Sequence, residues 1–246
     1  WPWVGDPADP VSMEKARKVR LAMSLDIDRE GIAKSVMMDI GRPFYMYELS
    51  TDDPYWQNKW KMPYDPVKAK QLLTEAGYPN GFTFEYRSEP GGLELEVTEA
   101  LASTWQTDLN IKTNITKVAY STFRPSIINH TAVPWFCGDG VSTFPTLWPK
   151  GLTLSSHSDG GYSCNMESPV IAKIFADMNV TSDVNKQKEL AFQFFDYLYD
   201  QQLVAGVAEF PGHAFYDPKK IVEWKMRPEG KGTGVINSPE WIKLAP

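Results

Sequence analysis

The sequence lacks most local signatures by which enzymes and metal-binding proteins are identified. Two cysteines and three histidines occur among 246 residues, and their positions show no metal-ligand spacing. The phosphate-binding glycine loops GxxxxGK(S/T) and GxGxxG are missing, and so are the hydrolase motifs HExxH and GxSxG. We therefore expect no metal site, no bound cofactor and no catalytic residues.

Long apolar runs and an excess of positive charge are also absent. No uncharged apolar run approaches the ~18 residues that cross a bilayer, so the sequence predicts no membrane-spanning helix. Lysine and arginine number 25 against 31 aspartates and glutamates, which gives a net charge of −6. Such a surface does not attract phosphate backbones, and we expect no nucleic acid partner. The chain starts at Trp1 rather than at methionine, so we expect a processed or cut chain without its targeting peptide.

Aromatic residues are plentiful, with 9 tryptophans, 11 tyrosines and 12 phenylalanines. Many must belong to the core, yet such a surplus also suits a binding cleft, because aromatic faces give large contact areas. Paired carboxylates such as Asp26 and Asp28, or Glu94 and Glu96, are interpreted as helix caps and helix-surface charges rather than as an acid–base pair.

The two cysteines, Cys137 and Cys164, leave two interpretations open. A disulfide between them would contribute about 3–4 kcal/mol by the loop-closure estimate. Two buried free thiols fit the sequence equally well.

Helical and strand patterns alternate along most of the chain, which predicts an α/β layered fold. The clearest signal lies in residues 65–82, where Asp65 is an N-cap, Pro66 occupies the first helical position and Gly77 ends the helix. Ser12 and Asp28 are the expected caps of two earlier helices. The predicted helices span 13–27, 29–38, 68–76, 93–109, 121–128, 168–178 and 183–202. The predicted strands span 82–87, 111–118, 132–137, 203–209 and 221–226, whereas 42–64, 138–161 and 227–246 read as irregular.

Two stretches go beyond composition and pattern. Residues 19–32 read VRLAMSLDIDREGI, and residues 64–82 read YDPVKAKQLLTEAGYPNGF. They resemble the motifs VRxALxxAIDRExI and YDPxKAKxLLxEAGYPxGF of the family 5 extracellular solute-binding proteins of ABC transporters, which include dipeptide and oligopeptide receptors. Weaker similarity extends over nearly the whole chain but covers only the C-terminal part of a complete receptor.

The resemblance implies a lobe of the type II periplasmic-binding-protein fold, an α/β lobe with a mixed sheet flanked by helices. It would be the C-terminal lobe of a two-lobe receptor whose N-terminal lobe is missing here. Residues 1–11 would be a lead-in, 12–210 the ligand-binding lobe and 211–246 a return segment towards the missing lobe. The receptor would be bacterial or archaeal, work in the periplasm or at the outer cell surface, capture a peptide-like solute, deliver it to a membrane permease and catalyse no reaction.

The resemblance also implies binding residues. Asp139 stands where peptide-binding members hold the ligand's α-amino group, and Arg124, fifteen residues earlier, would meet a peptide carboxylate. Pro125, directly after Arg124, departs from the family pattern. The remaining residues expected to line the cleft are Trp135, Phe136, Trp148, Tyr162, His213 and Phe215, with Phe44, Tyr45 and Tyr47 facing the cleft or the missing lobe. An exported, oxidising compartment favours the Cys137–Cys164 disulfide.

Three other functions remain open. An oligosaccharide receptor of the same family would use the tryptophans for stacking on sugars. A hydrolase would need a site centred on Cys137, for which no local signature exists. A stand-alone interaction module would dock a permease or sensor without a ligand.

Overall fold

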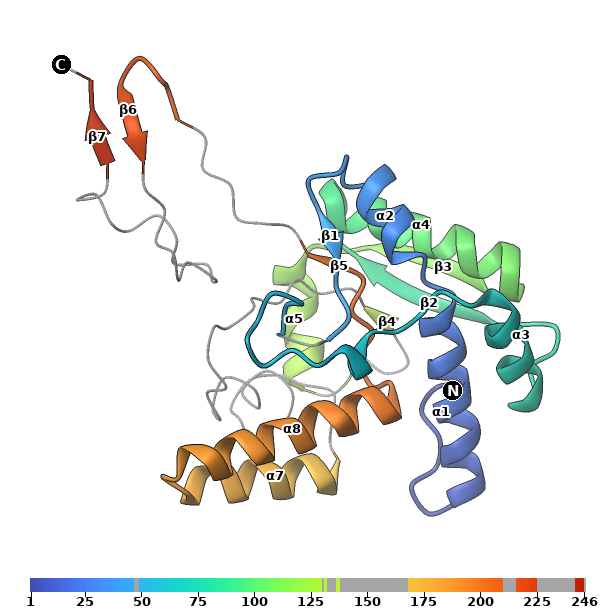
Figure 1. Ribbon diagram of the computed structural model, residues 1–246. Coiled ribbons are helices and arrows are strands. Elements are labelled where there is room, and N and C mark those ends of the chain that lie inside the picture. The colour runs from blue at the N-terminus through green and yellow to red at the C-terminus, as the bar shows by residue number, and fades with distance from the viewer. Residues whose placement is uncertain are drawn as a thin grey trace.

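The computed structural model describes residues 1–46, 49–129, 131, 136–137, 168–209, 216–224 and 242–245. Figure 1 shows a group of helices and strands around a small sheet, with one strand pair set apart from it. The helices are α1 (Pro10–Leu25), α2 (Arg29–Ser35), α3 (Pro66–Glu75), α4 (Gly92–Leu109), α5 (Tyr120–Ile128), α7 (Pro169–Val180) and α8 (Val184–Gln201). The strands are β1 (Arg42–Pro43), β2 (Thr83–Ser88), β3 (Lys112–Lys117), β4 (Phe136–Cys137), β5 (Ala208–Glu209), β6 (Ile221–Trp224) and β7 (Ile242–Leu244).

Helix α1 begins earlier than the sequence analysis predicted. Asp9 is its N-cap, because the Asp9 side chain accepts a hydrogen bond from the Val11 amide and Pro10 occupies the first turn. Ser12 instead accepts a hydrogen bond from the Asp6 amide, so the prediction of Ser12 as the cap is wrong. The expected inward face of this helix, with Val19 and Ala22, is fully buried.

The segment that carries the second motif folds as predicted. The Asp65 carboxylate accepts a hydrogen bond from the Lys68 amide at 2.8 Å, and α3 starts at Pro66. Gly77 follows the helix with φ +100°, a left-handed conformation that favours glycine. Asp28 likewise caps α2, which ends at Ser35, earlier than predicted.

Strands β2, β3 and β4 form a parallel sheet in the order β3-β2-β4. Helix α4 connects β2 to β3, as a parallel pair requires a crossover. Phe84 and Tyr86 point to the face that α4 covers, with ring centroids 6.1 and 6.4 Å from that of Trp105. Arg87 points to the opposite face, where its guanidinium lies 4.5 Å from the ring centroid of Phe123 on α5. The sheet is therefore a layer between α4 and α5.

A second apolar core lies between α7, α8 and the irregular segment before α3. Trp60 is fully buried there, and its indole N–H donates to Asp196 Oδ1 at 2.8 Å. Its ring packs against those of Phe192 and Phe195. This core takes up Tyr55, Trp56 and Trp60, three of the aromatics in the irregular segment 42–64.

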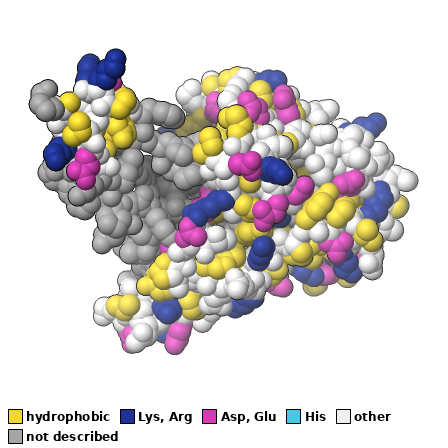
Figure 2. All heavy atoms as spheres, turned by 45° about the horizontal axis from the view of Figure 1, so that its top comes forward, with side chains coloured by type: hydrophobic (Ala, Val, Ile, Leu, Met, Phe, Trp, Pro, Cys, Tyr) yellow, Lys and Arg dark blue, Asp and Glu magenta, His cyan; other side chains and the backbone are white. Residues whose placement is uncertain are grey.

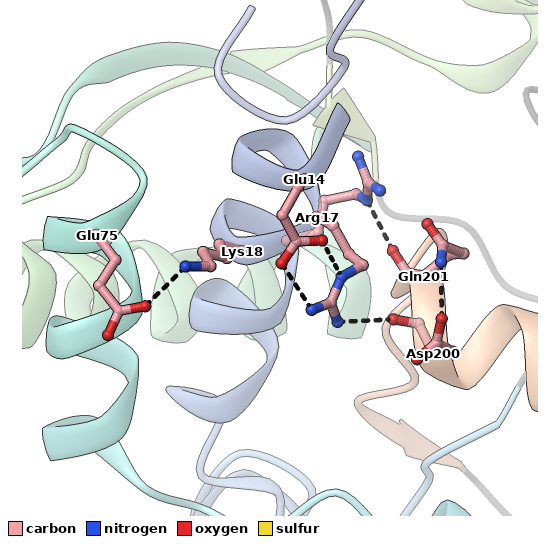
Figure 3. Close-up of polar contacts among 7 residues, drawn as sticks. Glu14, Arg17, Lys18, Glu75, Asp200 and Gln201 are labelled. Carbon is pink, nitrogen blue, oxygen red and sulfur yellow. Dashed lines mark hydrogen bonds and ion pairs between the residues drawn. The ribbon is translucent and has the colours of Figure 1, made fainter. Parts of the chain in front are cut away.

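Ionic and polar contacts join α1 to α3 and to the end of α8 (Figure 3). Lys18 contacts Glu75 of α3 at 2.8 Å. Arg17 donates to the Asp200 carbonyl at 3.3 Å, and Arg20 donates to the Gln201 carbonyl at 2.9 Å. Cations on α1 thus meet the carbonyls that the last turn of α8 leaves without helical partners.

The remaining strands form two antiparallel pairs, β1 with β5 and β6 with β7. The α/β fold is as expected, but over the described residues parallel and antiparallel pairing occur in separate sheets. Strand β5 is shorter than predicted, and β7 lies within residues 227–246, which were expected to be irregular. Among the described residues, no helix combines the length and the apolar character that spanning a membrane requires.

Candidate functional site

The ends of three parallel strands meet at one edge of the central sheet. Ser88 ends β2 and pairs in register with Lys117, the last residue of β3. On the other side, Arg87 pairs with Cys137, the last residue of β4. In open α/β sheets, ligands bind outside the carboxyl ends of the strands, so this edge is the candidate site.

Arg87 fixes the geometry of this edge. It is buried, and its Nη2 donates to the Val118 carbonyl at 2.8 Å and to Glu89 Oε1 at 3.0 Å. These bonds tie the residue that follows β3 to the residue that follows β2. The Phe123 ring below the guanidinium adds a cation–π contact.

Glu89 links the strand end to the start of α5. Its Oε1 accepts a hydrogen bond from the Tyr120 amide, at a helix N-terminus where a carboxylate is favourable. Its own amide donates to Glu94 Oε1 at 2.9 Å, in the first turn of α4. Glu89 therefore holds the starts of both crossover helices at the same edge.

Ser88 is the site residue that the sequence analysis missed. Its side chain is fully buried, and within the described part of the chain its hydroxyl has no hydrogen-bond partner. Buried hydroxyls are normally paired, so one without a partner at the carboxyl edge of a sheet is notable. Its position as the last residue of a predicted strand was the available signal.

Only part of the predicted site lies within the described residues. Arg124 is exposed on α5, one turn after Tyr120, and α5 continues through Pro125. The backbone of Phe136 and Cys137 forms β4. The predicted residues outside the described part of the chain are Asp139, Trp135, Trp148, Tyr162, Cys164, His213, Phe215 and Tyr47.

Phe44 and Tyr45 are core residues, against the expectation that they face a cleft or another lobe. They are 7% and 8% exposed. The Tyr45 ring lies 5.5 Å from the Arg29 guanidinium and 5.6 Å from Lys61 Nζ. Buried Arg29 also donates to the Gly206 carbonyl at 2.7 Å, which secures the segment before β5. Burial lowers the pKa of Arg29 to about 10, so it remains charged at neutral pH.

The face shown in Figure 2 carries lysines, arginines and acidic residues interspersed with apolar side chains. No field of a single sign dominates the part of this face that the structure describes. Recognition of a charged solute would therefore depend on individual groups such as those at the sheet edge.

Comparisons with known proteins agree on one family. The family model of the bacterial extracellular solute-binding proteins, family 5 Middle, matches residues 10–157. Heme-binding protein A of Haemophilus influenzae is 30% identical over 119 residues, which cover 44% of this chain and 20% of that protein. Glutathione-binding protein GsiB of Escherichia coli K12 is 41% identical over 66 residues, covering 27% and 13% of the two chains.

A solved structure shows the same fold. The dipeptide-binding protein of Pseudoalteromonas sp. SM9913, in complex with Met-Leu, is 25% identical and has a TM-score of 0.62. The match covers 79% of this chain and 39% of that one. The chain thus spans less than half the length of these relatives, and its fold is that of the type II periplasmic binding proteins.

Proposed function

Because the chain belongs to family 5 of the bacterial extracellular solute-binding proteins, we propose that it binds a small peptide-like solute and delivers it to a membrane permease. The observation that carries this proposal is the convergence of Ser88, Glu89 and the β4 end at the carboxyl edge of the parallel sheet. Solute-binding proteins of this family are not enzymes, and the proposed receptor carries its ligand unchanged. It would act in the periplasm or at the outer cell surface.

Asp139 and Arg124 are the proposed partners of the two peptide termini. Asp139 follows Cys137 by two residues, so the chain leaving β4 starts from the candidate site. A carboxylate there would pair strongly with an ammonium group, because screening is weak where water is excluded. Arg124, four residues after Tyr120 on α5, would offer a bidentate fork to the peptide carboxylate.

The proposed receptor buries its ligand between two lobes, of which residues 12–210 supply one. Residues 1–11 serve as the lead-in, and 211–246 return towards the other lobe. The relatives are more than twice as long as the regions of them that match this chain, and this difference in length supports the division into two lobes. The β6–β7 pair supports it too, because among the described strands these two pair only with each other.

Calorimetry on the full receptor separates a peptide ligand from an oligosaccharide. The ligands are Met-Leu, glutathione, an oligosaccharide mixture and heme, and the variant is Asp139→Ala. We expect peptide affinity to fall at least tenfold in the variant, whereas any sugar affinity should barely move. Asp177→Asn, an exposed α7 carboxylate, is the matched control. Saccharide binding without peptide binding would overturn the proposal in favour of the oligosaccharide receptor.

Two rival classes need their own assay. A hydrolase centred on Cys137 would turn over ester or peptide substrates and lose that activity in Cys137→Ser. A stand-alone module would bind a permease but no solute. Turnover that depends on Cys137 would replace the proposed function with the hydrolase. Binding to a permease without binding to any of the tested ligands would replace it with the stand-alone module.

A further inference from the structure

Asp26 is a buried carboxylate for which the proposed function has no role. It is the C-cap residue of α1, and its relative exposure is 0%. Both carboxylate oxygens are buried, and neither accepts a hydrogen bond from any residue that the structure describes. An ionised carboxylate in such a place loses its hydration without compensation. The sequence analysis took Asp26 for a cap or surface charge; its backbone is at the cap position, but its side chain is not at the surface.

A second carboxylate, that of Asp108 on α4, interacts with Asp26 both through its charge and as a side-chain hydrogen-bond partner. The Trp105 indole N–H donates to the Met23 carbonyl at 3.0 Å, which holds the last turns of α1 and α4 together. Asp26 lies three residues after Met23, at the C-cap of α1, and Asp108 lies three residues after Trp105, on the same face of α4. The Tyr64 hydroxyl donates to Asp108 Oδ2 at 3.4 Å.

No described cation neutralises Asp26. Three cations on the elements packed around it bond to other groups: Lys18 to Glu75, Arg20 to the Gln201 and Trp3 carbonyls, and Arg29 to the Gly206, Ser24 and Ile27 carbonyls. The acidic and phenolic groups there are Asp28, which accepts from the Gly31 amide, Asp65, which accepts from the Lys68 amide, and Tyr64, which donates to Asp108. The carbonyl end of α1 adds further negative potential.

Two ionised carboxylates can only accept hydrogen bonds, so neither can donate to the other. A proton bound to one of them would supply the missing O–H donor. We propose that Asp26 and Asp108 share one proton, and that this proton makes the packing of α1 against α4 sensitive to pH. Ionisation would release the proton to water and leave two like charges between the helices. Half-buried Asp108 and exposed Tyr64 give the proton a short route to solvent.

The direction in which stability changes with pH follows from the raised pKa of Asp26. Burial and, secondarily, Asp108 raise the pKa of Asp26 to about 7. In the unfolded chain an aspartate ionises near pH ~4. Between these values the folded chain binds more protons than the unfolded chain, so stability falls as pH rises from about 4 to about 7. Above about pH 7, the contribution of Asp26 to the free energy of unfolding no longer changes with pH.

Urea unfolding of the wild type and Asp26→Asn at about pH 5.5 and about pH 8.5, either side of this transition, tests the proposal. The wild-type midpoint should drop at the higher pH, and the drop should shrink by at least half in Asp26→Asn. Asp177→Asn should keep the full drop. An unchanged drop in Asp26→Asn overturns the proposal, and so does a midpoint raised by magnesium or calcium only when Asp26 is present.

Infrared spectroscopy of the wild type provides a readout that does not depend on a variant folding. A protonated-carboxyl band should be present at about pH 5.5 and disappear through neutrality, well above the ordinary aspartate range. Where Asp26→Asn folds, its spectrum should lack this band. A wild-type spectrum without a protonated carboxyl at that pH overturns the proposal.

Discussion

Arg87 on β2 lies beside Cys137 on β4 in parallel register, so the two strands end within one residue of each other. This pairing places the start of the segment that leads to Asp139 next to Ser88 and Glu89. The chain connections between the strands are long, and the relationship depends on sheet pairing rather than on sequence proximity. The candidate site is thus assembled by the order of three strands.

Replacing Arg87 by alanine should destabilise the protein. The change leaves the Val118 carbonyl without its donor and removes one partner of Glu89, so we expect a loss of about 1–3 kcal/mol in the free energy of unfolding. Lys173→Ala, which breaks an exposed ion pair on α7, should cost at most about 0.5 kcal/mol. Urea denaturation of both variants checks this, and equal losses would contradict the bracing role of Arg87.

The structure and the sequence prediction assign different residues as the N-cap of α1, Asp9 and Ser12. Asp9→Ala should cost about 1 kcal/mol, because the Val11 amide loses its acceptor. Ser12→Ala removes only an exposed bond to the Asp6 amide and should change stability by less than about 0.5 kcal/mol. Thermal unfolding compares the two; a larger loss at Ser12 would restore the original cap assignment.

Two glycines with positive φ should respond differently to alanine. At Gly77, φ is +100° and nothing lies within 4 Å of an added Cβ, so Gly77→Ala should cost only strain of about 1–2 kcal/mol. At Gly81, φ is +70° and an added Cβ would lie 2.0 Å from the Asn110 carbonyl oxygen. Gly81→Ala should therefore cost a further 1–3 kcal/mol, roughly the penalty of overpacking. Equal unfolding midpoints would show that the turn before β2 yields to the extra atom.

Two arginines of α1 hold the end of α8 unequally. Arg20 is part-buried and also donates to the Trp3 carbonyl at 2.5 Å, so Arg20→Ala should cost about 1.5–3 kcal/mol. Arg17 is more exposed and divides its bonds between Glu14 and the Asp200 carbonyl, so Arg17→Ala should cost less than about 1 kcal/mol. Proteolysis at the end of α8 provides a local measurement: cleavage should rise in Arg20→Ala, and a greater rise in Arg17→Ala would reverse the ranking.

The segments predicted best from the sequence are those fixed by local chemistry. Asp65, Pro66 and Gly77 determine where α3 begins and ends without help from the rest of the chain. Asp9 and Pro10 repeat the same Asp-Pro signal at the start of α1, so the true cap was available in the sequence and was passed over. Strand β7 has only three residues and depends on pairing with β6, which no local pattern announces.

The site was less accessible to sequence reasoning than the fold. The family motifs fall on α1, α2, α3 and the turn before β2, whereas Ser88 and Glu89 obtain their significance from strand pairing. Burial of Asp26 likewise depends on α4, a helix far along the chain, because the bond from Trp105 to the Met23 carbonyl brings that helix against the end of α1. The roles of Asp139 and Arg124 remain predictions.

The central claim, a peptide ammonium bound by Asp139, is tested most directly by a thermodynamic cycle on the full receptor. Calorimetry measures the affinities of the wild type and Asp139→Ala for Met-Leu and for N-acetyl-Met-Leu. In the wild type, acetylation should weaken binding at least tenfold, because it removes the ammonium charge; in Asp139→Ala, the two ligands should bind with nearly equal affinity. An acetylation penalty of the same size in both proteins would contradict the account.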